Sequence, residues 1–385
     1  MDFEFNDDLK MLQKMVRDFV QKEIAPYADE WDENHVYPRE IIKKMGELGL
    51  FGCTIPEEYG GNGMGFLAQM IITEELAYGS SGLRIAVNCN GLGSAFEIYK
   101  FGTEEAKQKY IPKLLSGELL GAFAITEPNS GSDVMSMKTT IEDKGDYLVL
   151  NGQKMWISNI PAADIAIVYG YYNRSKRGRG MAAVIMEMNS EGVTVGEIDK
   201  LGTRSFPAGE ISMDNVKVPK ENLLGNLGDG AKILFSSLNQ TRLSAAAGGV
   251  GVAQACLDVA TQYCNEREQF GQLIGKFQMN QDMIAEMSVE IECARLLVYK
   301  AAWQKDQGNI NNTREVAFAK YMAGRTAQKA SHYCMKILSA YGYSTEYPSA
   351  RLYRDAVLYQ IVEGTESVMK WIIAEDKLGY RKLNK

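Results

Sequence analysis

Two polar segments of the sequence carry the groups that could do chemistry. The first, residues 123–133 (Phe-Ala-Ile-Thr-Glu-Pro-Asn-Ser-Gly-Ser-Asp), combines hydroxyls, small residues and a proline. Such a loop can bring backbone N–H groups and hydroxyls close to a flat polar ligand or to phosphates, although short motifs of this kind also occur as ordinary turns. The second is Glu363, directly before Gly364 and Thr365. Its carboxylate is placed either to cap the following helix or to act as a base.

The composition argues against several other classes of protein. The chain has 385 residues, of which 45% are hydrophobic and 24% charged, as in globular proteins. With 42 basic and 49 acidic residues, its net charge of -7 lacks the basic excess of nucleic-acid-binding proteins, so we expect no nucleic-acid partner. The six cysteines are scattered singly and only two histidines are present, so we expect neither a metal site nor a disulfide framework.

Targeting signals are also missing from the sequence pattern. The N-terminal residues contain no basic region followed by an apolar one, as a secretory signal would. No run of about 18 apolar residues suggests a membrane span. We therefore expect a cytoplasmic protein without a membrane-spanning helix.

The elements that must position the two polar segments follow a helical, β, helical order. Apolar residues at three- and four-residue spacing predict helices at residues 6–25, 40–48, 67–78, 91–99 and 104–115. A period of two then predicts strands at 147–150, 155–158, 165–171, 181–188, 193–198 and 210–218, with Asn151-Gly152 as a hairpin turn. Long helices return at 231–266, 279–307, 314–341 and 367–378.

These patterns predict an α+β chain of three domains. The middle part lacks helices of the length that a βαβ crossover needs, so we expect an antiparallel sheet that is barrel- or sandwich-like. The predicted domains are an N-terminal helical domain (1–118), a middle antiparallel β-barrel domain (119–230) and a C-terminal helical bundle (231–385).

Several motifs, in order along the chain, resemble those of the acyl-CoA dehydrogenase family. The loop at 123–133 followed by Trp-Ile-Ser-Asn (156–159) resembles the family's flavin-binding β domain. Further matches are P-E-E-Y-G-G (56–61), R-E-Q-F-G (267–271), G-Y-S-T-E-Y-P (342–348) and E-G-T (363–365). The resemblance spans essentially the whole chain and implies an acyl-CoA dehydrogenase-like fold.

The resemblance implies FAD as cofactor, bound partly by a neighbouring subunit. It also implies a homotetramer built as a dimer of dimers. The implied cofactor-binding residues are Phe123, Ile125, Thr126, Trp156 and Ser158 around the ring, Arg267 and Phe270 at the FAD of the adjacent protomer, and Thr365 and Ser367 near the pyrophosphate.

The resemblance also implies an acyl-CoA substrate and a catalytic role for Glu363. In that family a glutamate in this setting removes the α-proton of the thioester, while the β-hydrogen leaves as hydride to the flavin. Burial is expected to raise the pKa of Glu363 toward neutrality. The electrons would then pass to an electron-transfer flavoprotein. The implied substrate-binding residues are Arg84, Ser132, Arg242 and Gly364.

The acyl group is the open question. Residues 76–84 (L-A-Y-G-S-S-G-L-R) resemble a segment of glutaryl-CoA dehydrogenases, whose arginine at the place of Arg84 pairs with the distal carboxylate. A surface or structural ion pair is the alternative for Arg84. Decarboxylating members have glutamate and tyrosine where this chain has Ala77 and Val362, so our hypothesis is glutaryl-CoA oxidation without decarboxylation. Dehydrogenases of short-chain acyl-CoA, and of alicyclic esters such as cyclohexanecarboxyl-CoA in anaerobic aromatic degradation, are the alternatives.

Two further functions are compatible with the same fold. One is an oxidase that passes electrons to O₂, and the other is a non-catalytic protein that binds CoA esters. The joint presence of Glu363, Thr126, Arg267 and Trp156 disfavours the non-catalytic protein, which would have no use for a base together with flavin contacts.

Overall fold

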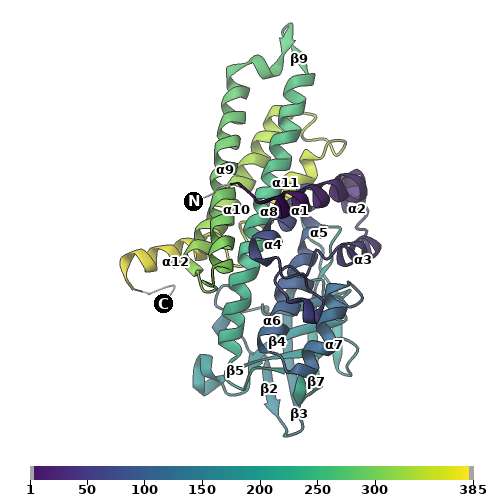
Figure 1. The fold of residues 1–385 in the computed structure, drawn as a ribbon, viewed down its shortest axis with the longest axis vertical. Helices are drawn as coiled ribbons and strands as arrows, with labels where there is room; N and C mark the ends of the chain where they lie inside the picture. The colour runs from purple at the N-terminus through teal and green to yellow at the C-terminus, as the bar shows by residue number, and fades with distance from the viewer. Residues whose placement is uncertain (1–3, 381–385) are drawn as a thin grey trace.

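Three long helices form the spine of the computed structural model, which describes residues 4–380 (Figure 1). α8 (Gly230–Glu266), α9 (Gln278–Asp306) and α10 (Thr313–Leu338) pack along one another. A small hairpin of β9 (Glu268–Gln269) and β10 (Gln272–Leu273) joins α8 to α9 at the end far from the sheet. Two shorter helices, α11 (Ser349–Leu358) and α12 (Glu366–Leu378), complete this part.

Small residues explain why α8 lies so close to its neighbours. A methyl group added at Gly251 would lie 2.2 Å from the carbonyl oxygen of Glu74 on α4 (Gly65–Gly79). One added at Gly249 would lie 3.1 Å from the carbonyl oxygen of Ala323 on α10. The backbones of these helices therefore approach within contact distance, and α8 becomes the central helix of the core. Within residues 4–380, α8 alone has the length and apolarity of a membrane span, but 78% of the relevant window is buried inside the protein.

The N-terminal helices surround one side of α8. A nearly continuous helical stretch runs from α5 (Ser81–Ala86) through the π-helical turns of η4 (Val87–Ala95) into α6 (Phe96–Phe101). The remaining helices of this part are α1 (Asp7–Phe19), α2 (Ala28–Glu33), α3 (Arg39–Glu47) and α7 (Glu104–Leu115). Their apolar faces join a core cluster that also includes one face of the sheet.

The middle of the chain forms one sheet of eight strands at the lower end of the molecule in Figure 1. Its strand order is β6-β7-β3-β2-β4-β5-β8, and β1 pairs with β4. A second apolar cluster, rich in alanine, valine and isoleucine, fills its other face. The strands are β1 (Gly121–Ala124), β2 (Thr140–Asp143), β3 (Tyr147–Ser158), β4 (Ile165–Tyr171), β5 (Met181–Glu187), β6 (Val193–Glu197), β7 (Ala208–Pro219) and β8 (Leu223–Leu224).

The sheet differs from the prediction in two respects. It is mixed and not purely antiparallel, because β1 pairs in parallel with β4, and β2 meets β4 in parallel at one position. The predicted hairpin at Asn151-Gly152 is wrong, since β3 runs through both residues and pairs with β7 on either side of them. The register shifts there, and Gly152 adopts a φ of 148° that places it against Thr139. Gly152 is therefore part of a β-bulge and not of a turn.

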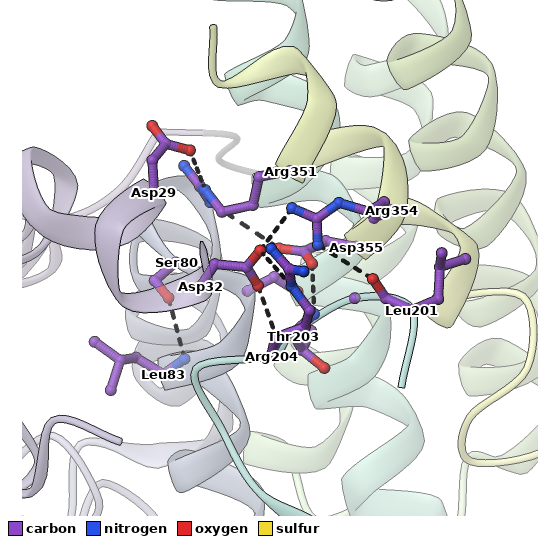
Figure 2. A network of polar contacts seen from close by, with 12 residues as sticks. Asp29, Asp32, Ser80, Leu83, Leu201, Thr203, Arg204, Arg351, Arg354 and Asp355 are labelled. Carbon is purple, nitrogen blue, oxygen red and sulfur yellow. Dashed lines mark hydrogen bonds and ion pairs between the residues drawn. The ribbon is translucent and has the colours of Figure 1, made fainter. Parts of the chain in front are cut away.

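A buried ionic cluster joins all three parts of the chain (Figure 2). Asp32 on α2 accepts hydrogen bonds from the Arg204 backbone N–H (2.8 Å) and from Arg354 Nη2 on α11 (2.6 Å). Asp355 accepts from the Thr203 N–H at 2.6 Å. Burial alone would raise the pKa of Asp32, but the Arg354 and Arg204 guanidinium groups outweigh it and hold the pKa below its ordinary value. Burial raises the pKa of Asp355 to about 6.

We predict that Asp32→Ala destabilises the protein substantially. Removing one partner of a buried ion pair leaves the other charge unpaired, which commonly costs about 3–5 kcal/mol. The midpoint of thermal unfolding should fall clearly. Glu118→Ala is the matched control, because it breaks an exposed pair with Lys113 and should leave the midpoint almost unchanged. Equal midpoints for the two variants would show that the cluster does not hold the three parts together.

Candidate active site

Glu363 lies in the loop between α11 and α12, with its backbone in the left-handed region. Glu363 has a φ of 57° and Gly364 a φ of 100°. Thr365 is the N-cap of α12, and its side chain accepts from the Val368 N–H at 3.3 Å. The capping interpretation of Glu363 is therefore wrong, and its carboxylate faces α8 instead. There Glu363 Oε2 accepts a hydrogen bond from Thr241 Oγ1 at 2.6 Å.

Two cations hold the backbone of this loop in place. Arg242 Nε donates to the Glu363 carbonyl oxygen at 2.7 Å. Lys320, which is buried on α10, donates to the carbonyl oxygens of Tyr359 (2.7 Å) and Gly364 (3.2 Å). Because these bonds bracket Glu363, they stabilise a conformation that a glutamate rarely adopts.

The environment of Glu363 suits a base that works near neutral pH. Burial raises the pKa of its carboxyl group above the ordinary value. The hydrogen bond from Thr241 and the charges of Arg242, Arg84 and Lys320 act in the opposite direction without cancelling the rise. Burial likewise lowers the pKa of Lys320 to about 8.

Arg84 lies on α5 and is buried, with 2% of its surface exposed. Its guanidinium group lies over the Tyr359 ring at 5.4 Å, and the Tyr359 hydroxyl is 2.8 Å from Ser81 Oγ. A methyl group at Gly248 would lie 2.9 Å from Arg84 Nε, so this glycine makes room for the cation. Within residues 4–380, the Nε and Nη1 atoms of Arg84 have no hydrogen-bond partner, and no carboxylate forms an ion pair with Arg84. Both alternatives for Arg84, a surface or a structural ion pair, are therefore unsupported.

The first polar loop and the segment after Lys154 lie side by side. The Met155 N–H donates to the Thr126 carbonyl oxygen at 2.8 Å. Trp156, at a register shift in β3, has a φ of 61° and a side chain that is 56% exposed. Thr126 and Ser158 beside it are also partly exposed. The exposed Trp156 ring and the hydroxyls of Thr126 and Ser158 together suit a flat polar ring system such as a flavin.

A buried ion pair between Lys154 and Glu127, which the sequence patterns did not predict, holds the first polar loop against β3. Lys154 is fully buried and donates to Glu127 Oε1 and to the Ile125 carbonyl oxygen, both at 3.0 Å. Glu127 Oε1 also accepts from the backbone N–H (2.9 Å) and the hydroxyl (2.6 Å) of Thr139. Burial lowers the pKa of Lys154 to about 8, against the influence of Glu127. A lysine at an inward position of a strand was the signal that could have revealed it.

The other predicted residues are distributed unevenly. Phe123 is half-buried on β1, where a methyl group at Gly93 would lie 2.4 Å from its ring. Ile125 is buried, whereas Ser132 and Ser367 are exposed on the surface. Arg267 and Phe270 lie at the β9–β10 hairpin, at the opposite end of the molecule from the sheet in Figure 1. Phe270 is 93% exposed. One chain therefore does not bring these two residues to Trp156.

Comparison with known proteins assigns the chain to a family. Three family models match the chain. The N-terminal domain of acyl-CoA dehydrogenases matches residues 6–118, the middle domain matches 122–216 and the C-terminal domain matches 228–378. The chain belongs to the acyl-CoA dehydrogenase family. Because this family depends on FAD, the protein is an FAD-dependent oxidoreductase that dehydrogenates acyl-CoA thioesters.

Several relatives match over nearly their full length. The chain is 58% identical to a glutaryl-CoA dehydrogenase of Desulfococcus multivorans over 389 residues, which covers 100% of both chains. A glutaryl-coenzyme A dehydrogenase solved as its glutaryl-CoA complex matches with a TM-score of 0.99 and 57% identity, over 100% of this chain and 98% of that one. A glutaryl-CoA dehydrogenase from Mycobacterium smegmatis in complex with FADH2 matches with a TM-score of 0.93 and 30% identity, over 97% and 95%.

We predict that the Lys154–Glu127 pair is needed to retain FAD. Lys154→Met leaves the Glu127 carboxylate buried without its cation, so the loop that it orders should loosen and FAD should be lost more readily. The measurement is the ratio of flavin to protein absorbance after gel filtration. The double variant Lys154→Met/Glu127→Gln removes both charges and should recover part of the ratio.

Lys138→Met is the matched control for this prediction. Its side chain is exposed, and Glu127 accepts from the Lys138 backbone N–H, which the substitution keeps. Flavin retention in Lys154→Met equal to that of the control would contradict the role of the ion pair.

Proposed function

We propose that the protein oxidises glutaryl-CoA to glutaconyl-CoA and retains the distal carboxylate. The observation that carries this proposal is Arg84, a buried guanidinium without an acidic partner in the described chain, whose charge acts on the Glu363 carboxyl group. A pocket for a plain aliphatic acyl group has no use for such a charge, whereas a dicarboxylic acyl group supplies the missing anion. The similarity to glutaryl-CoA dehydrogenases over the whole chain supports it.

In this proposal Glu363 is the base. Its carboxylate takes the proton from C2 of the thioester, and the hydrogen on C3 leaves with its electron pair as a hydride. Bound FAD supplies the hydride acceptor. We expect the Glu363 backbone N–H to stabilise the thioester oxygen as negative charge develops on it. Thr241 orients the carboxylate, while Arg242 and Lys320 fix the backbone that carries it.

Retention of the carboxylate is supported by the apolar residues Ala77 and Val362, which stand where decarboxylating relatives have polar ones. Ala77 is fully buried on α4, and a methyl group added at Gly251 of α8 would lie 3.0 Å from the Ala77 Cβ. Gly251 lies about one helical turn after Gly248, the glycine that adjoins Arg84. Val362 precedes the base. Neither residue can supply the carboxyl or phenol group that decarboxylating relatives have at these places, so we propose that the C4–C5 bond stays intact.

We further propose that the enzyme is a homotetramer that passes its electrons to an electron-transfer flavoprotein. Arg267 and Phe270 lie far from Trp156 within one chain and are exposed at a hairpin, which supports contact with the FAD of a neighbouring protomer. A dehydrogenase of an alicyclic ester such as cyclohexanecarboxyl-CoA is the second candidate, and the substrate comparison below separates it from the first.

Glu363→Gln should lower the rate of dehydrogenation by about 100-fold or more while FAD and acyl-CoA still bind, because the amide cannot accept the proton. The measurement is turnover with an artificial electron acceptor, together with ligand binding by difference spectra. In the unmodified enzyme the rate should rise with pH through the raised pKa of Glu363, since only the ionised form is a base. Thr241→Val removes a hydrogen bond that lowers the pKa of Glu363, so the acidic limb of the pH–rate profile should move to higher pH. Activity of Glu363→Gln within a few-fold of the unmodified enzyme would eliminate Glu363 as the base.

Arg84→Met should reduce kcat/KM for glutaryl-CoA by about 100-fold or more, because deleting one partner of a buried charge pair commonly costs about 3–5 kcal/mol. Turnover of butyryl-CoA or cyclohexanecarboxyl-CoA should stay nearly unchanged or improve. Mass spectrometry of the product from the unmodified enzyme should show glutaconyl-CoA. Release of CO₂ would contradict retention of the carboxylate, and preference of the unmodified enzyme for the alicyclic ester would contradict the choice of substrate.

A further inference from the structure

One face of α8 connects the two charged ends of the site. Ser237, Thr241, Ser244 and Gly248 recur at spacings of three and four residues, so they lie on the same side of the helix. Thr241 contacts the Glu363 carboxylate at one end. Gly248 adjoins the Arg84 guanidinium and the Tyr359 hydroxyl at the other. About 10 Å of helix axis separates Thr241 from Gly248, and Ser244 lies between them.

The hydroxyl of Ser244 lies in the interior of the protein. Its side chain has no exposed surface, and within residues 4–380 no hydrogen bond reaches its Oγ atom. A serine or threonine inside a helix usually bonds back to the carbonyl four residues earlier, as Thr241 does to Ser237 at 3.1 Å. Ser244 does not form this bond to Gln240. Because buried hydroxyls are nearly always satisfied, its proton is available to a ligand that enters between Glu363 and Arg84.

We propose that Ser244 donates a hydrogen bond to the distal carboxylate of the acyl group, next to Arg84. This inference rests on the proposed function. When C2 lies at Glu363 and the carboxylate at Arg84, the far end of the acyl chain passes along the α8 face that carries Ser244. Hydrogen bonds to ionised acceptors are stronger than neutral ones, so the hydroxyl adds selectivity for a dicarboxylic over a monocarboxylic acyl group.

Tyr359 is a positioning residue in this arrangement. Its ring supports the guanidinium group, and its hydroxyl is fixed by Ser81. With Gly248 leaving space on the other side, Arg84 is confined between α8 and the loop before Glu363. The guanidinium group therefore lies against the α8 face that carries Ser244, one helical turn farther along it.

The test compares Ser244→Ala with Ser237→Ala in the FAD-loaded enzyme. Ser237 is also buried on this face of α8, but it faces Tyr169 of the sheet, so its loss is the same chemical change outside the acyl pocket. Ser244→Ala should lower kcat/KM for glutaryl-CoA by about 10-fold or more and change that for butyryl-CoA by less than about 2-fold. Ser237→Ala should leave the ratio of the two unchanged.

A binding measurement separates recognition from turnover. Analogues in which sulfur replaces C3 have no hydrogen to transfer, so isothermal titration with the dicarboxylic and monocarboxylic forms reports binding alone. Ser244→Ala should weaken only the dicarboxylic form. Equal losses for both forms would mean a structural role and overturn the inference, as would no change for either. If Arg84→Met abolishes the preference for glutaryl-CoA while Ser244→Ala does not, only this inference fails. If Arg84→Met keeps the preference, the proposed substrate fails.

Discussion

The site depends on one constraint, which is that the Arg84 guanidinium group is buried without an acidic partner among residues 4–380. A direct pair between Arg84 and Glu363 would neutralise both charges and would lower the pKa of Glu363, which would make it a poor base. The structure instead gives each charge its own neutral neighbour: Thr241 bonds to the carboxylate, and the Tyr359 ring supports the guanidinium. α8 keeps the two apart, because Thr241 and Gly248 lie two turns from each other on one face. The separation leaves one group for the acidic carbon of a substrate and the other for an anion farther along it.

Holding a glutamate at positive φ requires support from outside the loop. The loop is short, since α11 ends at Leu358 and α12 begins at Glu366. On one side Lys320 and Arg242 bind its carbonyl oxygens. On the other, Arg354 and Asp355 tie α11 to α2 and to the segment around Thr203 (Figure 2). Strain of this kind persists only where surrounding contacts determine it, and here they come from all three parts of the chain.

The sequence was informative where a local pattern decides the structure. Period and length predicted most of the helices and the strand at residues 165–171, which is β4 within its observed bounds. Order and spacing of motifs predicted the family. Asn151-Gly152 was misleading because the turn preference of two residues was overridden by pairing of β3 with β7 over its whole length. Lys154, Thr241 and Lys320 were missed because their importance comes from partners 27 to 122 residues away, which no local pattern contains. The parallel pairing of β1 with β4 is equally non-local.

The same non-local character means that the site exists only when the three parts are docked. Arg84 is contributed by the N-terminal helices, Trp156 by the sheet, and Thr241 and Glu363 by the C-terminal helices. The ionic cluster around Asp32 is linked to two of these contributions. Figure 2 shows it together with Ser80, which caps α5 ahead of Arg84, and α11, which carries Arg354 and Asp355, leads on to Glu363. Loosening the cluster would therefore shift Arg84 and Glu363 relative to each other and to α8. Because these groups must keep a fixed separation to serve one acyl chain, the cluster couples the stability of the fold to the geometry of the site.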